Sequence, residues 1–335
     1  MTRPKVVIAH YEGIELFAAR DLEALGDIAD VLDPNPLGTW DGPRADELLA
    51  AAEIILGHWG CPRLDAPVLD RAPDLRLLAY AAGTVKEVVT DAVFERGVRV
   101  TSGSVANAEP VAEYTLAMIL LAGKDVLWRR DSDRDPSLQD ARQPSTVPVG
   151  NWDKTIGIVG ASAVGRRVIE LLRPFPTLDV VVFDPFLTAD AAAGLGAVKV
   201  DELDDLCRRV DVLSIHAPAL PETRHLVGAA QLAALRTGAT VINTARASVV
   251  DQEALDAELA NGRLYAVLDV TEPEPLPADH PLRRHPNAFL TPHLAGSEGT
   301  ELGRLSAFAI EEVRRFGAGE LPRNEVTREA LGRLA

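Results

Sequence analysis

"TIGIVGASAVGRRVIELLR", residues 155–173, is the stretch that decides the fold. It begins with β-branched residues and continues with apolar residues at helical spacing, which predicts a strand, a tight loop and a helix. Gly160 and Gly165 occupy two of the three glycine positions of the fingerprint G-x-G-x-x-G, and Ser162 occupies the middle one. Free N–H groups at such a helix start favour a phosphate. The stretch therefore predicts a dinucleotide-binding unit with one departure in its loop.

The departure lies where the backbone comes closest to a pyrophosphate. Serine is small, tolerates turn geometry and can offer its hydroxyl to a phosphate oxygen. Asp184 ends the next predicted strand, 19 residues beyond Gly165, where an acid meets the ribose 2′-hydroxyl. An acid repels a 2′-phosphate, and the following "PFLTAD" contains no arginine, so NAD is favoured over NADP. An α/β domain that binds no nucleotide can show the same features, and that alternative stays open at this point.

Short apolar strands alternate with helical patterns along all 335 residues, which is typical of parallel sheets wound with helices. The length suggests about two domains. The predicted strands are 5–9, 53–57, 75–80 and 98–102, and then 155–159, 179–183, 211–215, 239–245, 265–270 and 288–292. A helix over 108–124, with Pro110 in its first turn, and a polar segment, 129–150, separate the two sets. We predict an α/β fold of two wound parallel-sheet units, the second inserted into the first.

Composition narrows the classes of function. The net charge of −16 argues against nucleic acid or an anionic membrane as a partner, because both need a basic face. Cys61 and Cys207 form no CxxC pair and no cluster with histidines, so we expect neither a disulfide framework nor a metal site. The chain begins with a strand pattern rather than a signal peptide, and no apolar run approaches the ~18 residues of a membrane span. We expect a cytoplasmic protein.

Three polar residues follow successive strands of the second set. Arg246 lies just past the strand in "VINTAR", Glu274 lies in the proline-rich loop of "VTEPEPLP", and His293 follows "AFLTP". The carboxyl ends of parallel strands form the edge where wound sheets bind ligands. Singly, these residues are equally well explained as a surface ion pair, a solvated loop acid and a hydrogen-bonded loop histidine.

Together, the three residues suit one task. Arginine grips a carboxylate with its planar fork, histidine exchanges a proton near neutral pH, and glutamate orients and charges the histidine. These are the groups needed to move a hydride between a nicotinamide and C2 of a 2-hydroxy or 2-keto acid.

The segments "SIHAPALPETRHLVG" (214–228), "LDVTEPEPLPADHPL" (268–282) and "TPHLAG" (291–296) resemble the D-2-hydroxyacid dehydrogenase family of NAD-dependent enzymes. The resemblance covers about residues 75–315. It implies that Arg246 binds the substrate carboxylate and carbonyl, that His293 is the general acid/base, and that Glu274, rather than Glu272, is its partner. Reduction of the keto acid is the direction we expect at neutral pH.

The resemblance also implies a domain plan: a discontinuous, flavodoxin-like substrate domain of residues 1–102 plus 298–335, with a Rossmann NAD-binding domain, residues 103–297, inserted into it. The cofactor residues predicted from the loop and the acidic strand end are Gly160, Ser162, Ala163, Val164, Gly165 and Asp184. Those implied by the resemblance are His216, Ala217, Pro218, Thr223, Thr244, Ala245, Arg246, Asp269, His293 and Gly296. For His216, a contribution of backbone alone is the equal alternative.

On the substrate side, the resemblance implies that the turn "AAGT" offers backbone N–H groups to the carboxylate, and we choose Gly83 and Thr84. His58 and Trp59, after another strand, either shape specificity or, for Trp59 in particular, pack under a loop. Family members dimerise through the cofactor domain, so we expect a homodimer. The polar segment 129–150 is either an arm in that interface or a surface loop.

Two rival functions use the same fold. One is oxidation of another small anion: the formate branch carries glutamine at the Glu274 position, which argues against formate, whereas phosphite stays open. The other is an NAD-sensing binding protein, like the transcriptional corepressors that share this scaffold. The side chain of the substrate is not encoded in any motif.

Overall fold

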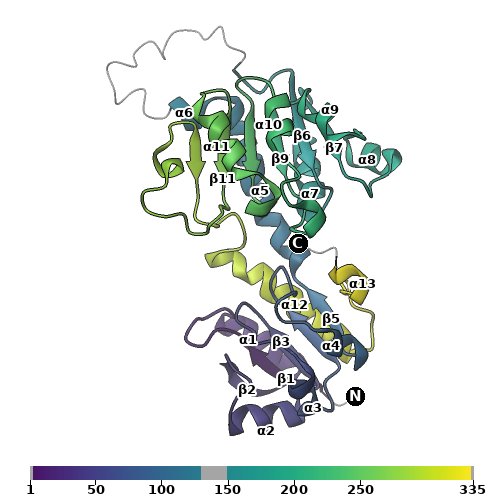
Figure 1. The fold of residues 1–335 in the computed structure, drawn as a ribbon. Helices are drawn as coiled ribbons and strands as arrows, with labels where there is room; N and C mark the ends of the chain where they lie inside the picture. The colour runs from purple at the N-terminus through teal and green to yellow at the C-terminus, as the bar shows by residue number, and fades with distance from the viewer. Residues whose placement is uncertain (1–2, 130–148, 333–335) are drawn as a thin grey trace. The chain divides into compact units, whose positions relative to one another are not determined.

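The structure is a computed structural model that describes residues 3–129 and 149–332. The chain divides into two compact units (Figure 1). Unit 1 joins the chain up to Asn107 to the chain from Ser297 onward, and unit 2 is Ala108–Gly296. Unit 2 is therefore inserted into unit 1. Most of the polar segment 129–150, with the predicted dimer arm, lies outside the described residues.

Unit 1 is built on a five-stranded parallel sheet in the order β2-β1-β3-β4-β5. This is the flavodoxin-like order, and it confirms the predicted fold class. The strands are β1 (Lys5–Ala9), β2 (Asp30–Leu37), β3 (Ile54–Gly57), β4 (Leu77–Tyr80) and β5 (Arg99–Ser102). The helices are α1 (Ala19–Ile28), α2 (Pro43–Ala51), α3 (Ala66–Asp70), α4 (Asp91–Glu95), α12 (Leu302–Gly317) and α13 (Arg328–Leu331), and η5 (Gly299–Glu301) is a 3-10 turn.

The alternation of side chains along β1 sends its residues into two cores. Val6 and Ile8 pack in the layer of α1 and α12, and Val7 and Ala9 pack in the layer of α2, α3 and α4. Figure 1 shows α12, in yellow, among the purple N-terminal elements of this unit. Helix α12, from the C-terminal part of the chain, thus completes a layer that the N-terminal segment does not cover alone.

Strand β2 was missing from the predicted strands. Its sequence, "DVLDPNPL", contains Pro34 and Pro36, which cannot donate to a sheet ladder. The strand lies at the edge of the sheet and pairs only with β1, through a register that shifts twice. Edge strands tolerate proline because their outer N–H groups have no partner strand.

Unit 2 holds a seven-stranded sheet in the order β12-β11-β10-β9-β6-β7-β8, in which neighbouring strands run parallel. Counted from β6, this is the 3-2-1-4-5-6 order of a Rossmann fold with a seventh strand added. The strands are β6 (Lys154–Val159), β7 (Leu178–Phe183), β8 (Val198–Lys199), β9 (Val212–Ile215), β10 (Thr240–Asn243), β11 (Tyr265–Leu268) and β12 (Ala288–Leu290).

Helices cover both faces of this sheet. Ile156 and Ile158 of β6 pack in the layer of α5, α7 and α8, whereas Val159 packs in the layer of α9, α10 and α11. The helices are α5 (Ser104–Gly123), α6 (Val126–Arg129), α7 (Ala163–Leu172), α8 (Ala189–Leu195), α9 (Leu203–Cys207), α10 (Ala229–Ala234) and α11 (Gln252–Ala260), with 3-10 turns η2 (Pro221–Thr223), η3 (Ala247–Val249) and η4 (Pro281–Arg284). Within residues 3–129 and 149–332, no helix combines the length and apolar character that a bilayer crossing requires.

Helix α5 begins earlier than predicted, so the placement of Pro110 in a first turn was wrong: the proline lies inside the helix. Two hydrogen bonds support the extra turn. Ser104 N donates to Ser102 Oγ at 3.1 Å, and Asn107 N donates to Gly103 O at 2.9 Å. The first turn of α5 therefore lies before Pro110, so the helix has already begun where the proline lacks a backbone N–H donor.

Candidate active site

The glycine loop after β6 has the geometry that two of its glycines require. Gly160 has φ +95°, and a Cβ there would lie 2.7 Å from Ala217 N. A Cβ on Gly165 would lie 2.1 Å from Gly160 O. Both positions therefore exclude any larger residue, and α7 begins directly after the loop. The loop fits a phosphate-binding role, since the helix start points its free N–H groups out of the same turn.

Ser162 is the N-cap of α7. Its backbone is extended, with φ −64° and ψ 179°, which any residue can adopt, and its Oγ accepts a hydrogen bond from Gly165 N at 3.3 Å. The missing glycine thus strains nothing at this position. Serine is also among the preferred residues for an N-cap.

Asp184, after β7, holds the same loop. Its Oδ2 accepts from Ala161 N at 2.7 Å and its Oδ1 accepts from Phe186 N at 2.8 Å. A carboxylate can accept about four hydrogen bonds, so capacity remains for a ribose hydroxyl. The donor set, the cradle at Gly160 and the acid together fit a dinucleotide.

His216 follows β9, and its ring turns into the core. His216 Nε2 lies 2.9 Å from Ser214 Oγ, and burial lowers the pKa of the ring to about 3. The backbone of His216 and of Ala217 abuts Gly160. Thr223 Oγ1 donates to Pro218 O at 2.5 Å, so this hydroxyl shapes the loop after β9. These contacts favour the backbone alternative for His216.

Arg246 follows β10 on a loop held by a buried asparagine that sequence reasoning missed. Asn243 Nδ2 donates to Arg246 O and Asn243 Oδ1 accepts from Ala245 N, both at 3.0 Å. Arg246 Nη1 donates to Ala245 O at 2.7 Å. Burial lowers the pKa of the half-buried guanidinium and the charge of Glu274 opposes that shift; an arginine stays charged regardless.

Glu274 and His293 form a hydrogen-bonded pair. His293 Nδ1 lies 2.8 Å from Glu274 Oε1, and the side chains are 51% and 41% exposed. His293 has φ +56°, in the left-handed region, where histidine is one of the tolerated residues. The pair is accessible. Arg246, Glu274 and His293 follow β10, β11 and β12, which are neighbouring parallel strands, so all three predicted catalytic residues lie on the carboxyl edge of one sheet.

Asp269, after β11, anchors the loop that carries His293. Its carboxylate accepts from Thr291 Oγ1 at 2.6 Å, Leu294 N at 2.9 Å and Ala295 N at 3.0 Å. Its own carbonyl accepts from His293 N at 3.0 Å. Three donors leave about one acceptor position on the carboxylate, which is compatible with a contact between Asp269 and the cofactor.

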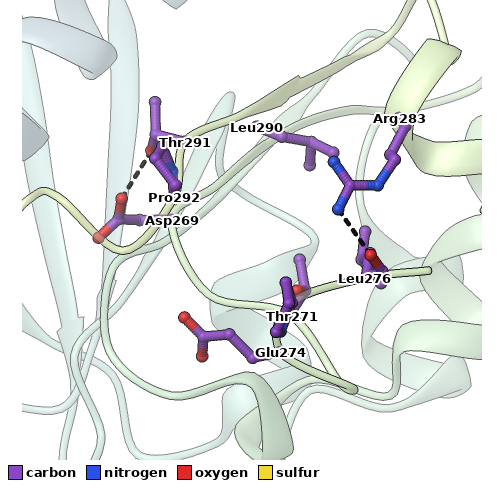
Figure 2. Close-up of a pocket in the computed structure, with 9 residues that line it drawn as sticks. Asp269, Thr271, Glu274, Leu276, Arg283, Leu290, Thr291 and Pro292 are labelled. Carbon is purple, nitrogen blue, oxygen red and sulfur yellow. Dashed lines mark hydrogen bonds between the residues drawn. The ribbon is translucent and has the colours of Figure 1, made fainter. Parts of the chain in front are cut away.

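A cavity of about 380 Å³ opens beside Glu274. Figure 2 shows Glu274 and the hydrogen-bonded Thr291 and Asp269 on its wall. Its lining comprises Asp269, Thr271, Glu274, Pro275, Leu276, Arg283, Leu290, Thr291 and Pro292. Of these, only Asp269 and Glu274 were predicted as site residues.

The loop that carries Glu274 has its own support. Gln252, at the start of α11, donates through Nε2 to Glu272 O at 2.8 Å and accepts through Oε1 from Glu272 N at 3.0 Å. This two-way contact mimics the pairing of a neighbouring strand. Sequence reasoning missed Gln252 because its partner is a backbone segment 20 residues away.

Unit 1 contains four of the residues predicted to bind the substrate, and the fifth, Arg246, lies in unit 2. Gly83 and Thr84 lie in the turn after β4, where Gly83 O accepts from Ser102 Oγ at 2.5 Å. His58 is fully buried after β3: its Nδ1 accepts from Trp59 N at 2.8 Å and its ring packs edge-on against Phe17. Burial, and secondarily His10, lowers the pKa of His58 to about 3. Contact of these four residues with a substrate stays a prediction.

In the part of the chain that the structure describes, no group of three His, Cys, Asp or Glu residues could hold a metal ion. The sheet order of unit 2 and the loop after its first strand define a protein of the Rossmann dinucleotide-binding class.

Comparison with known proteins narrows this class. The family "D-isomer specific 2-hydroxyacid dehydrogenase, NAD binding domain" matches residues 116–295, more than half of the chain. The glyoxylate reductase of Aeropyrum pernix is 32% identical over 345 residues, with 99% of this chain and 98% of that protein covered. The chain therefore belongs to the D-isomer specific 2-hydroxyacid dehydrogenase family.

A second relative and a solved structure agree. The D-3-phosphoglycerate dehydrogenase of Mycobacterium bovis is 34% identical over 325 residues, with 96% of this chain but 58% of that protein covered. The crystal structure of the TT0316 protein from Thermus thermophilus matches with a TM-score of 0.74 and 30% identity, covering 96% of this chain and 100% of that one. The chain spans 55% to 58% of the length of the first phosphoglycerate dehydrogenases it matches.

Proposed function

We propose that this protein is an NAD-dependent oxidoreductase that interconverts a small 2-keto acid and the corresponding D-2-hydroxy acid. The observation that carries the proposal is the hydrogen bond of 2.8 Å between His293 Nδ1 and Glu274 Oε1, beside the half-buried Arg246. The relatives named glyoxylate reductase and D-3-phosphoglycerate dehydrogenase support a small 2-keto or 2-hydroxy acid as the substrate.

His293 exchanges the proton in this mechanism. Because Glu274 accepts from Nδ1, the other ring nitrogen, Nε2, is left to face the substrate oxygen. In the direction of reduction, a doubly protonated His293, stabilised by the Glu274 carboxylate, donates its Nε2 proton to the carbonyl oxygen. In the reverse direction, neutral His293 accepts that proton from the hydroxyl.

Arg246 binds the carboxylate of the substrate with its planar guanidinium and polarises the carbonyl. Its charge counts for more because the side chain is half-buried. The turn at Gly83 and Thr84 is proposed to add backbone N–H donors for the same carboxylate.

Gly160, Gly165, Ser162 and the start of α7 are proposed to hold the pyrophosphate, and Asp184 the adenosine ribose. NADH, when bound, supplies the hydride for C2 of the keto acid. Asp184 supports NAD over NADP because its carboxylate would face and repel a 2′-phosphate. A homodimer that forms through unit 2 is also part of the proposal.

A panel of 2-keto acids followed by NADH absorbance tests this function. The panel contains glyoxylate, hydroxypyruvate, a bulky aromatic acid and a doubly anionic acid, and phosphite with NAD is a separate arm. We expect NADH oxidation with at least one keto acid. NADH binding without turnover on any member would contradict the proposal and support the sensor, and turnover on phosphite alone would support oxidation of that anion.

A further inference from the structure

Two adjacent side chains of α5 contact the loops that carry His293 and Arg246. Tyr114 Oη lies 2.8 Å from Thr291 Oγ1, and Thr115 Oγ1 lies 3.1 Å from Thr244 Oγ1. Thr291 is two residues before His293, and Thr244 is two residues before Arg246. One turn of α5 thus contacts two loops of unit 2, in each case two residues before a proposed catalytic residue.

The direction of the first hydrogen-bond chain follows from proton counting. Thr291 Oγ1 donates to Asp269 Oδ1 at 2.6 Å, and a threonine hydroxyl has a single proton to give. Tyr114 must therefore donate to Thr291. Burial raises the pKa of Tyr114, so the phenol keeps its proton at neutral pH.

Asp269, at the end of this chain, is the residue that holds the His293 loop. It is 2% exposed, and it accepts from Leu294 N and Ala295 N, the two residues after His293. A hydrogen bond from Tyr114 polarises the Thr291 hydroxyl and strengthens its bond to Asp269. The orientation of the carboxylate thus depends on α5.

The second chain runs the opposite way. Thr115 Oγ1 donates to Val111 O at 2.7 Å, so its proton is used and Thr244 donates to Thr115. Thr115 is fully buried and Thr244 is 8% exposed, so water offers little replacement for this bond. Loss of Thr115 Oγ1 would leave the Thr244 hydroxyl without its acceptor.

We propose that Tyr114 and Thr115 are positioning residues, which set the loops of His293 and Arg246 relative to each other from one helix. Neither side chain is placed against the substrate. The inference rests on the proposed function only in the roles it gives to His293 and Arg246.

Two readouts test it. Hydrogen exchange of the protein without substrate reports on the loops, and steady-state kinetics reports on their use. Tyr114→Phe should speed exchange at residues 293–295 about fivefold and lower kcat by about fivefold, with the KM for the keto acid unchanged. Thr115→Val should instead speed exchange at residues 244–249 and raise the KM for the keto acid by about the same factor.

Four variants make the result specific. Thr115→Ser retains the hydroxyl and should restore wild-type values, which a loss of packing alone would not predict. Thr291→Val removes the bond to Asp269 itself and should have at least the effect of Tyr114→Phe, and the double variant should be no worse than Thr291→Val alone. Tyr265→Phe removes a hydroxyl that makes no hydrogen bond among the described residues, and it should change neither readout.

Exchange rates within twofold of wild type in both Tyr114→Phe and Thr115→Val would overturn the proposal. It would also be overturned if either variant sped exchange equally in the His293 loop and in the Arg246 loop. If wild-type protein turns over no keto acid, the proposed function fails. The exchange measurement then still decides whether α5 holds the two loops.

Discussion

Histidines follow parallel strands in both units, yet His10 and His58 of unit 1 are buried whereas His293 of unit 2 is exposed. In unit 1, His10 and His58 follow β1 and β3 and are 4% and 0% exposed. In unit 2, His293 follows β12 and its side chain is 51% exposed. A place at the carboxyl edge of a sheet therefore does not make a polar residue available for chemistry.

The neighbours decide the outcome. Phe17 packs against both His10 and His58, with ring centroids 5.7 and 5.5 Å apart. Around His293, by contrast, the neighbouring polar groups hold backbone: Asp269 binds the N–H groups of the same loop, and Gln252 binds the backbone of the Glu274 loop. Phe17 thus helps to bury the rings of His10 and His58 in unit 1, and His216 after β9 of unit 2 is buried as well. At His293, by contrast, the polar neighbours hold the loop by its backbone and leave the ring accessible.

The largest expected effect comes from removing the accessible ring. His293→Asn should lower turnover by about 10²–10⁴-fold, because the general acid/base is lost, while NADH binding persists. Asparagine is chosen because it tolerates the left-handed backbone at this position.

His225→Asn is the matched control. His225 also has a positive φ, of 52°, and lies 4.0 Å from a carboxylate, that of Asp251. The turnover of His225→Asn should stay within about threefold of wild type, since an exposed charge pair at this distance contributes little. Turnover in His293→Asn close to that of wild type would remove His293 from its proposed role.

A lower pH should destabilise unit 1 through its buried histidine, His58. The pKa of His58 is about 3 in the folded protein, against about 6.5 in an unfolded chain. Between these values the unfolded state binds a proton that the folded state does not, so the stability of unit 1 is lost as pH falls below about 6.5. The loss should be about 2 kcal/mol at pH 5. His10, whose pKa burial also lowers, adds in the same direction.

Hydrogen exchange of the β1 and β3 amides at pH 7 and pH 5, corrected for intrinsic rates, measures this loss. His58→Asn retains an acceptor for Trp59 N but does not titrate, so its opening free energy should fall less with pH than that of wild type. An equal fall in both proteins would show that His58 does not cause the acid sensitivity.

The comparison of the two units also shows which features could be predicted from the sequence. The strands of unit 2 and the residues after them were predictable, because β-branched runs bounded by turn residues are a local signal and strand ends meet at one edge. The burial of His58 was not, since it depends on Phe17, 41 residues earlier in the chain. The role of Asp269 depends on N–H groups about 25 residues away, and the strand β2 was hidden by its own prolines.

A smaller effect is expected from loosening a supporting residue. Gln252→Ala removes both hydrogen bonds to the backbone of Glu272, and each is worth about 1 kcal/mol. We expect kcat to fall by about three- to tenfold without a change in NADH affinity, because the Glu274 loop loses its anchor.

Gln231→Ala controls for the loss of a glutamine side chain. Gln231 also binds backbone, accepting from Gly228 N at 3.1 Å, but at the start of α10 rather than in a catalytic loop. Its kcat should match wild type. Equal losses in the two variants would show that the effect of Gln252 is on the stability of unit 2 and not on the position of Glu274.

The smallest effect is expected at Ser162, which stands where the fingerprint has its middle glycine. Its φ of −64° and its hydrogen bond from Gly165 N show a residue that caps α7 without strain. Ser162→Gly should therefore lower stability by only about a few tenths of a kcal/mol. NADH affinity, measured by fluorescence titration, should stay within about tenfold, which is roughly 1.4 kcal/mol. Gly160→Ala is the contrasting variant, because its Cβ would meet Ala217 N at 2.7 Å, and it should bind NADH far more weakly. A loss beyond tenfold in Ser162→Gly would mean that the hydroxyl binds the cofactor itself, so that the departure in the loop is a ligand rather than a cap.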